Sequence, residues 1–436
     1  MKQWTSRFNN YFKEKALKET DVTNIDIVIN DKIKYQKHLG FGGAFTDAAC
    51  SIFKKLNDEQ KDLAIKLLFK EEGLNYNLGR LTIGSCDFST CSYDYAHSLD
   101  SHDFTIDYEK ENIDIFLKRA LDIKEMTLFA APWSPPVQFK TSDDKNHGGK
   151  LDKKYYHEYA KYLCKYVEAQ QSRGIPLKYM TMQNEPEAVQ TWESCIYTEE
   201  DELSLVQIFK EESKNYNFEI DILLWDHNRD VLPRRIENYE KFDPNFDEYT
   251  KGFAYHWYDG DKWDNLTKAH EKYPNSLLVF TEGCIELLSL NANNPSSALG
   301  TMNNAFRYAR NYINDSLNYS NAFIDWNLLL DEQGGPNHVG NFCEALIQLD
   351  TKKQELIINP SYYIVKHFSH FIKPSAYRID FINNTNALVT SYLNPNGEIV
   401  VVILNEGEEK QKVMSVRGKK YLVDLPAFSI TTCVFK

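Results

Sequence analysis

Residues 277–284 read LLVFTEGC and residues 179–186 read YMTMQNEP, so in both segments a strand-like apolar run leads to a glutamate. Runs of this length and content are typical of strands that are buried on both faces of a parallel sheet. A carboxylate at the end of such a strand is costly unless it is paired or used. Glu185 and Glu282 therefore indicate a functional site at the carboxyl ends of parallel strands.

Similar runs recur along most of the chain, and amphipathic stretches of helical period lie between them. The expected strands are Leu39–Phe45, Asn77–Ile83, Met126–Ala131, Tyr179–Asn184, Ile220–Asp226, Gly252–Trp257, Leu277–Glu282 and Ala322–Asn327. The clearest helical stretches are Asp58–Phe69, Ile113–Leu121, Lys154–Arg173, Glu200–Glu212 and Ala298–Ser316. This alternation predicts an α/β fold, a (β/α)8 TIM barrel, which we assign to residues 38–371.

The two ends of the chain are rich in β-type residues instead. Short strands are expected at Ala387–Leu393, Glu398–Leu404, Lys412–Val416 and Ser429–Phe435, with a hairpin turn at Asn394–Gly397. Near the start, Asn24–Asn30 alternates apolar and polar residues, and after a short turn at Asn30-Asp31 the pattern continues. Because a lone hairpin is marginally stable, we expect residues 1–37 and 372–436 to form one side-attached antiparallel β-sandwich.

Composition excludes several classes of function. The chain has 50 Lys and Arg against 63 Asp and Glu, a net charge of −13, which suits neither nucleic acid nor an anionic membrane surface. No apolar run is long enough to span a membrane, and Met1–Ala16 lacks the core of a secretory signal. The eight cysteines include no C-x-x-C pair and are interpreted as reduced thiols. We therefore expect a cytoplasmic protein with no nucleic-acid partner and no stable membrane insertion.

The two glutamates suggest the chemistry. Strands four and seven lie roughly opposite one another in a ring of eight, so Glu185 and Glu282 should face each other at the barrel mouth. Two carboxylates that flank a bond are what glycoside hydrolysis requires, and aromatic rings supply platforms for sugars. Either glutamate alone could be a strand-end charge paired with a loop cation. The two together, with tryptophans beside them, favour a glycosidase.

Other strand-end residues are individually weaker candidates. Asp87 could be a turn cap or could bind a sugar hydroxyl, and Arg80, inside a strand, needs a carboxylate partner such as Glu282. His256 could be a core histidine or a site residue. Trp133, Trp257 and Trp326 could be rim packing or sugar platforms, and Asn341 could reach the site from the last loop. The histidines lack metal-ligand spacing, so we expect neither a metal nor a cofactor.

The motifs, in their order along the chain, resemble glycoside hydrolase family 30, and most of all its glucosylceramidase branch. The matching segments are Gly40–Ala49, Ser85–Ser89, Pro132–Pro136, Asn184–Pro186, His256–Tyr258, Thr281–Cys284, Asp325–Asn327, Gly334–Asn337 and Asn341-Phe342. The resemblance implies a (β/α)8 barrel with a β-sandwich built from both termini, and retaining hydrolysis of β-linked sugars.

The resemblance also implies roles for single residues. Glu185 corresponds to the acid/base and Glu282 to the nucleophile. The residues expected to hold the sugar are Asp87, Trp133, Asn184, Trp326 and Asn341, and those expected to support the nucleophile are Arg80, His256, Tyr258 and Trp257. His338 replaces an aromatic residue expected in lipid-hydrolysing relatives, which argues against a ceramide glycoside as the physiological substrate.

Such a mechanism makes two geometric and electrostatic demands. The two carboxyl groups should lie about 5–5.5 Å apart, and the pKa of Glu185 should be higher than that of Glu282. Three other activities fit the same barrel, namely those of a β-xylosidase, a β-fucosidase and a 1,6-β-glucanase. A non-catalytic sugar-binding protein is a remote alternative, since neither carboxylate is lost.

Overall fold

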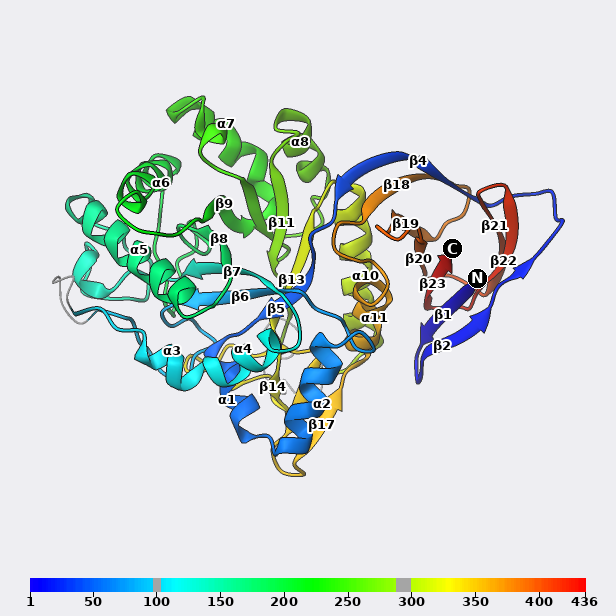
Figure 1. The fold of residues 1–436 in the computed structure, drawn as a ribbon, viewed down its shortest axis with the longest axis horizontal. Helices are drawn as coiled ribbons and strands as arrows, with labels where there is room; N and C mark the ends of the chain where they lie inside the picture. Colours follow the sequence, from blue (N-terminus) through cyan, green and yellow to red (C-terminus); the bar gives the residue numbers. More distant parts are fainter. Residues whose placement is uncertain (97–102, 288–298) are drawn as a thin grey trace.

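The larger part of the chain forms a closed barrel of eight parallel strands (Figure 1), as the sequence predicts. The computed structural model describes residues 1–96, 103–287 and 299–436. In order around the barrel the strands are β5 (Gly40–Ala44), β6 (Leu78–Ile83), β7 (Thr127–Pro132), β8 (Leu177–Thr181), β9 (Asp221–Asn228), β10 (Gly252–His256), β11 (Leu277–Glu282) and β13 (Ala322–Asn327).

Helices surround the barrel and cover its apolar outer face. They are α1 (Asp47–Lys55), α2 (Asp58–Phe69), α3 (Asp107–Asn112), α4 (Asp114–Leu121), α5 (Tyr156–Ser172), α6 (Glu199–Ser213), α7 (Leu232–Phe242), α8 (Asp264–Lys272), α10 (Met302–Leu317) and α11 (Pro360–Ser369). Asn57 and Gln60 form a capping box that begins α2, and Thr198 and Asp201 do the same for α6. The expected helix at Ala298–Ser316 corresponds to α10, and its first residue lies outside the described residues.

Glycine brings the first two barrel strands close together. A Cβ built on Gly42 of β5 would lie 2.1 Å from the backbone oxygen of Leu78 in β6. Gly43, the next residue, pairs with Gly79 of β6. The glycines of the GFGG sequence at residues 40–43 therefore allow close contact between these strands.

The sandwich is one continuous ladder of ten strands in the order β2-β1-β23-β20-β19-β18-β4-β21-β22-β3. Its strands are β1 (Lys2–Arg7), β2 (Asn10–Ala16), β3 (Lys18–Glu19), β4 (Ile27–Lys37), β18 (Tyr377–Asn383), β19 (Leu388–Leu393), β20 (Ile399–Asn405), β21 (Lys410–Val416), β22 (Lys419–Leu425) and β23 (Ser429–Phe435). It has a hydrophobic core of its own, to which both termini contribute, with Ile27 and Ile379 fully buried in it.

Two details of the sandwich differ from the sequence prediction. The expected hairpin with a turn at Asn30-Asp31 is wrong, because β4 runs unbroken through both residues and absorbs them in an irregular register with β18. Asn30 and Asp31 read as turn residues, but their side chains bond Asp380 and Arg417 across the sheet. The N-terminal hairpin of β1 and β2, which turns at Asn9 with a φ of 53°, was not expected from the mixed polar sequence.

The sandwich packs against α10 and α11, which lie between it and the barrel (Figure 1). Ser316 of α10 bonds the hydroxyls of Thr390 and Tyr392 in β19. His367 of α11 bonds Ser6 in β1 and Thr432 in β23. Within the described residues, no helix is long and apolar enough to cross a membrane.

Short strands complete the walls at the carboxyl end of the barrel. β12 (Ile285–Glu286) pairs with β15 (Cys343–Glu344), while β14 (Leu330–Asp331), β16 (Ile347–Asp350) and β17 (Glu355–Ile358) form a small sheet. These pairings bring the segment after β13 back to the segment after β11. The segments that follow β6, β7, β8 and β10, together with the end of β9, contribute other residues that line this end of the barrel.

Candidate active site

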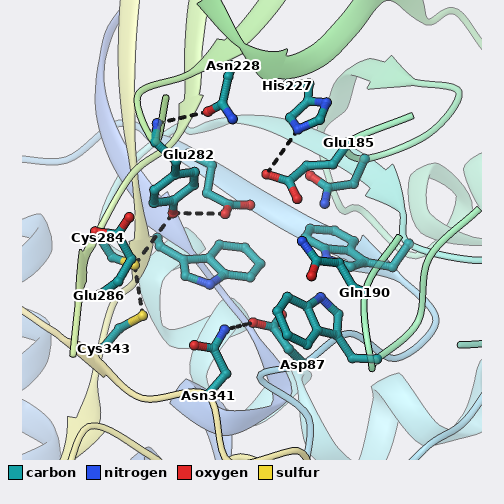
Figure 2. Close-up of a pocket in the computed structure, with 15 residues that line it drawn as sticks. Asp87, Glu185, Gln190, His227, Asn228, Glu282, Cys284, Glu286, Asn341 and Cys343 are labelled. Carbon is teal, nitrogen blue, oxygen red and sulfur yellow. Dashed lines mark hydrogen bonds and ion pairs between the residues drawn. The ribbon is translucent and has the colours of Figure 1, made fainter. Parts of the chain in front are cut away.

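A cavity of about 320 Å³ opens at the carboxyl ends of the barrel strands (Figure 2). All its described walls come from segments at or after strand ends, where the sequence predicted a site. The lining residues are Asp87, Trp133, Asn184, Glu185, Gln190, Trp192, His227, Asn228, Tyr258, Glu282, Cys284, Glu286, Trp326, Asn341 and Cys343.

The carboxylates of Glu185 and Glu282 point toward one another across this cavity (Figure 2). An oxygen of Glu185 and an oxygen of Glu282 lie within 4.8 Å of each other, and a ring nitrogen of His256 lies within the same distance of both. Glu282 ends β11, as expected. β8 ends earlier than expected, at Thr181, so Glu185 stands in the following loop in the left-handed region, with a φ of 48°.

Glu282 is held by two hydrogen-bond donors. Its Oε2 accepts from Arg80 Nη1 at 2.6 Å, and its Oε1 accepts from the Tyr258 hydroxyl at 3.0 Å. Arg80 lies in β6 and is 1% exposed, and its second guanidinium nitrogen, Nη2, donates to Asn184 at 2.8 Å and to Asp226 at 2.9 Å. One buried arginine thus fixes Glu282 and also Asn184, the residue before Glu185.

Asp226 is the buried acceptor behind both glutamates. Besides Arg80 it accepts from Thr181, Thr281 and the Nε2 of His256, the last at 3.1 Å. The other ring nitrogen of His256, Nδ1, lies 3.2 Å from Glu185 Oε1. Asp226 has a φ of 57°, a strained position for a non-glycine residue, and this bend in β9 turns its carboxylate into the barrel.

These contacts set the protonation of the cluster. Burial alone would lower the pKa of His256, but Glu282, Asp226 and Glu185 outweigh it and raise that pKa to about 9. Burial would raise the pKa of Asp226, yet Arg80 and His256 hold it well below its usual range. The cluster therefore holds two cations, Arg80 and His256, and the three carboxyl groups of Glu185, Asp226 and Glu282. One proton shared among these carboxyl groups would make the cluster neutral.

The order of the two glutamate pKa values is the reverse of the sequence expectation. Burial raises the pKa of Glu282 although His256 and Arg80 oppose it. Burial also acts on Glu185, but His227 and His256 outweigh it and lower the pKa of that carboxyl. The prediction that Glu185 has the higher pKa is therefore wrong, because His256 is hydrogen-bonded to Glu185 and His227 lies 4.0 Å from the same carboxyl.

The residues predicted to hold a sugar all line the cavity. Asn341 Nδ2 donates to Asp87 Oδ2 at 2.8 Å, and burial together with Glu282 raises the pKa of Asp87 to about 7. Trp133 and Trp326 stack on each other with ring centroids 5.3 Å apart and planes inclined by 16°. Trp133, Trp326 and the amide of Asn184 give the cavity both aromatic and hydrogen-bonding surface.

Trp257 does not line the cavity. It follows His256, whose side chain points into the barrel, and side chains alternate along a strand, so the Trp257 indole points outward. It packs against Tyr308 of α10, and its Nε1 donates to the backbone oxygen of Cys284. Trp257 therefore supports the segment after Glu282 from outside, and the reading of it as a possible sugar platform is wrong.

Sequence reasoning missed the residues on the loops. Gln190 and Trp192 follow β8 at a distance that no strand pattern marks, and Glu286 and Cys343 meet only through the pairing of β12 with β15. Asp226 and His227 did carry a signal, since both stand at the expected end of the fifth strand, but no role was assigned to them.

Glu185, His256 and Glu282 are close enough together to share a cation. The hydrogen bonds of these residues argue against a bound cation. His256 lies between Asp226 and Glu185, and because its pKa is raised to about 9 its ring carries a proton at neutral pH and offers no free lone pair. Arg80 already neutralises Glu282. The arrangement suits proton transfer and nucleophilic attack better than metal binding.

Two family models match successive parts of the chain. The family described as the glycosyl hydrolase family 30 TIM-barrel domain matches residues 38–372, and the family 30 beta sandwich domain matches residues 375–433. A Caenorhabditis elegans protein described as putative glucosylceramidase 4 is 33% identical over 433 residues, 93% of this chain and 82% of the relative.

Two solved structures resemble the whole chain. SrfJ from Salmonella typhimurium has a TM-score of 0.92 and 30% identity, covering 100% of this chain and 99% of its own. An endo-β1,6-glucanase has a TM-score of 0.88 and 26% identity, covering 99% of this chain and 98% of its own. The likeness therefore extends over barrel and sandwich together.

Proposed function

The chain belongs to glycoside hydrolase family 30 and is a glycoside hydrolase, and we propose that it is a retaining β-glucosidase. Like a glucosylceramidase, it would remove a β-linked glucose. The observation that carries the retaining mechanism is the separation of Glu185 and Glu282, whose nearest oxygens lie within 4.8 Å. Retaining enzymes place their carboxyls about 5–5.5 Å apart, whereas inverting enzymes leave about 6.5–9.5 Å for a water molecule.

In the first step Glu282 attacks the anomeric carbon and Glu185 protonates the leaving oxygen. Arg80 and the Tyr258 hydroxyl support the attack because they orient the Glu282 carboxylate and stabilise its ionised form. The bond between the sugar and the leaving group breaks, and a glycosyl ester on Glu282 forms. Asn184 and the Asp87–Asn341 pair lie where they can hold the hydroxyls of the sugar.

Acid catalysis by Glu185 requires that substrate binding raise its pKa. The Glu185 side chain keeps 15% exposure, so a bound glycoside can bury it further and disfavour its ionised form. Once Glu282 is esterified, it no longer carries a negative charge near Glu185. The pKa of Glu185 then falls again, and the carboxylate serves as base for the water that releases the sugar.

A second candidate is a β-1,6-glucanase. Beyond the residues assigned to the first sugar, the wall carries Gln190, Trp192, Asn228 and Glu286, and no aliphatic side chain lines the cavity among the described residues. Amides, a carboxylate and an indole suit a second sugar better than a lipid chain. One of the structurally similar proteins is itself an endo-β1,6-glucanase.

A panel of substrates tests both candidates. We would assay nitrophenyl β-glucoside, β-xyloside and β-fucoside, glucosylceramide in detergent, and a β-1,6-linked glucan, and follow the anomeric configuration of the first product by NMR. The proposal expects the glucoside to be the best aryl substrate and β-glucose to appear first. Preference for the xyloside or fucoside would overturn the sugar assignment, and an α-configured first product would overturn retention. Faster hydrolysis of the glucan than of any monoglucoside would favour the second candidate.

A further inference from the structure

A second ion pair lies beside the cavity, and the mechanism above makes no use of it. His338, in the segment between β14 and β15, places its Nε2 3.3 Å from Glu193 Oε2. Glu193 is 1% exposed and belongs to the loop after β8, next to Trp192 of the cavity wall. Its other oxygen, Oε1, accepts from the Ser85 hydroxyl at 2.6 Å. A buried carboxylate thus joins three rim loops.

Both ring nitrogens of His338 face acceptors. Nδ1 lies 2.9 Å from the backbone oxygen of Ser89, which can only accept a hydrogen bond, and Nε2 faces the Glu193 carboxylate. In a neutral imidazole one nitrogen would carry a lone pair and would be repelled by the oxygen in front of it. The arrangement therefore fits the protonated imidazolium, which donates from Nδ1 to Ser89 and attracts the Glu193 carboxylate by charge, since Glu193 Oε2 has no hydrogen-bond partner of its own.

A short chain of bonds connects this pair to the expected sugar site. The side-chain oxygen of Asn337 accepts from the backbone nitrogens of Val339 and Asn341, so His338 and Asn341 belong to one folded turn. Asn341 in turn donates to Asp87 at 2.8 Å. On the other side, Ser85 and Ser89, which His338 and Glu193 hold, flank Asp87 in the loop after β6.

We propose that His338 and Glu193 form a charged clamp that positions Asn341 on Asp87, so that the sugar pocket of this enzyme is fully formed only while His338 carries a proton. The proposal rests on the proposed function, in which Asp87 and Asn341 bind the sugar. His338 is a positioning residue and does not touch the reacting atoms. Loss of its proton would free the segment 337–341 and weaken sugar binding without changing the chemical step.

The charges around His338 give the pH dependence its sign. Glu193 faces it from the loop after β8, and Asp87 lies near it in the loop after β6; the contact with Glu193 raises the pKa of His338 above its ordinary value. Lys145 approaches Ser85 and pairs with Asp94 at the far side of the same loop. The clamp is therefore closed below the raised pKa of His338, and it opens as the pH rises through that pKa.

Kinetics on the best aryl glycoside of the panel test the clamp. His338→Gln and Glu193→Gln should each raise KM about tenfold while kcat stays within about threefold, and the double variant should be no worse than either. KM of the wild type should rise at alkaline pH, and that rise should vanish in His338→Gln. His338→Arg, which keeps a charge and two donor edges, should hold KM near the wild-type value at every pH.

His147→Gln is the matched control, because His147 and Asp144 form a similar pair that is exposed on the rim. An equal rise of KM in this control, or an alkaline rise of KM that survives in His338→Gln, would overturn the clamp.

NMR of the ring nitrogens of labelled histidine separates the clamp from the proposed function, since it needs no activity. At pH 7 the His338 ring should be doubly protonated in the wild type and neutral in Glu193→Gln. A neutral ring in the wild type would overturn the clamp, whether or not the protein hydrolyses glycosides. Failure to hydrolyse any glycoside of the panel, with a protonated His338, would overturn the proposed function alone.

Discussion

Glu185 and Glu282 lie in one cavity, yet they have different partners. Glu282 is bonded by Arg80 of β6 and by Tyr258, which follows β10, whereas Glu185 contacts His256 and lies 4.0 Å from His227. Arg80 opposes the rise in pKa that burial gives Glu282 and so favours the ionised form that attacks, while Glu185, beside histidines, can gain and lose a proton. The roles proposed for them follow from these partners.

Alanine at each position should separate the two roles. Glu282→Ala removes the nucleophile, so kcat should fall at least about 10⁴-fold on every substrate. Glu185→Ala should lower kcat/KM by about 10²–10⁴-fold on alkyl glucosides, which need a proton, and by less than about tenfold on 2,4-dinitrophenyl glucoside. Added azide should restore turnover of both variants on the activated substrate, and the product should be the α-glucosyl azide for Glu282→Ala and the β-glucosyl azide for Glu185→Ala. Equal losses on activated and unactivated substrates would contradict the assignment.

The pH profiles should show the effect of substrate on Glu185. In the free enzyme its pKa is lowered by His227 and His256 against the effect of burial, and a bound glycoside buries the carboxyl further. Because kcat/KM reports the free enzyme and kcat the complex, the basic limb of kcat should lie at higher pH than that of kcat/KM. Steady-state rates between pH 4 and 9 check this. A basic limb of kcat at the same or lower pH would mean that binding does not raise the pKa of Glu185.

At the scale of elements, alternation along a strand decides which side chains enter the pocket. His256 ends β10 and points inward, and Trp257, one residue on, points out toward α10. Trp133→Phe should therefore raise KM about three- to tenfold, since Trp133 lines the cavity. Trp257→Phe should leave KM within about twofold and lower the free energy of unfolding by about 1 kcal/mol, because its bond to Cys284 is lost.

Thermal unfolding and steady-state kinetics of the two variants check this contrast. Both are Trp→Phe changes at strand ends of one barrel, so each serves as the control for the other. A rise of KM in Trp257→Phe that matches the rise in Trp133→Phe would contradict this contrast. It would mean that an indole outside the cavity affects sugar binding as strongly as one that lines it.

The sequence was sufficient for the barrel because each barrel strand carries a local apolar signal. The position of Glu282 at the end of its strand could be predicted to the residue, since β11 and the apolar run in the sequence end together. For Glu185 the sequence predicted the correct end of the barrel but not that the residue lies in a loop. The left-handed backbone conformation at Glu185 leaves no periodic signal in the sequence. The residues that depend on contacts distant in sequence, such as Glu193 with His338 or Glu286 with Cys343, could not be paired from one chain.

The same reason explains the error in β4. The turn-like residues Asn30 and Asp31 are satisfied by Asp380 and Arg417, which lie about 350 residues or more away along the chain. A strand whose polar residues find partners across the sheet needs no turn. Local propensity predicted a break there, and tertiary contacts overrode it.

At the scale of the whole molecule, barrel and sandwich are joined through buried histidines. His367 of α11 bonds Ser6 and Thr432 of the sandwich, and His38 lies between β4 and β5, packed on Phe41 and Tyr392. Burial lowers the pKa of each of these two histidines to about 3. Both are therefore neutral in the folded protein under conditions in which an unfolded chain would protonate them.

The sign of the resulting pH dependence follows from linkage. Between pH 6.5 and about 3 the unfolded state binds a proton at each site and the folded state does not, so stability is complete above pH 6.5 and falls as the pH decreases. Each histidine contributes up to about 1.4 kcal/mol per pH unit in this range. His367→Gln should reduce the slope of stability against pH by that amount, even if it lowers stability at pH 7.

Calorimetry of the wild type and His367→Gln at pH 7, 5.5 and 4.5 measures this slope. Other groups also titrate in this range, so the difference between the two proteins is the quantity that matters, and His157→Gln, on the exposed face of α5, is the control that should not change it. Equal slopes in His367→Gln and the wild type would mean that the junction between barrel and sandwich opens before its histidine is protonated. A smaller slope places the acid sensitivity at the contact of α11 with β1 and β23, because the Thr432 hydroxyl donates to the His367 backbone oxygen, which leaves Ser6 of β1 as the donor from which a protonated ring could no longer accept.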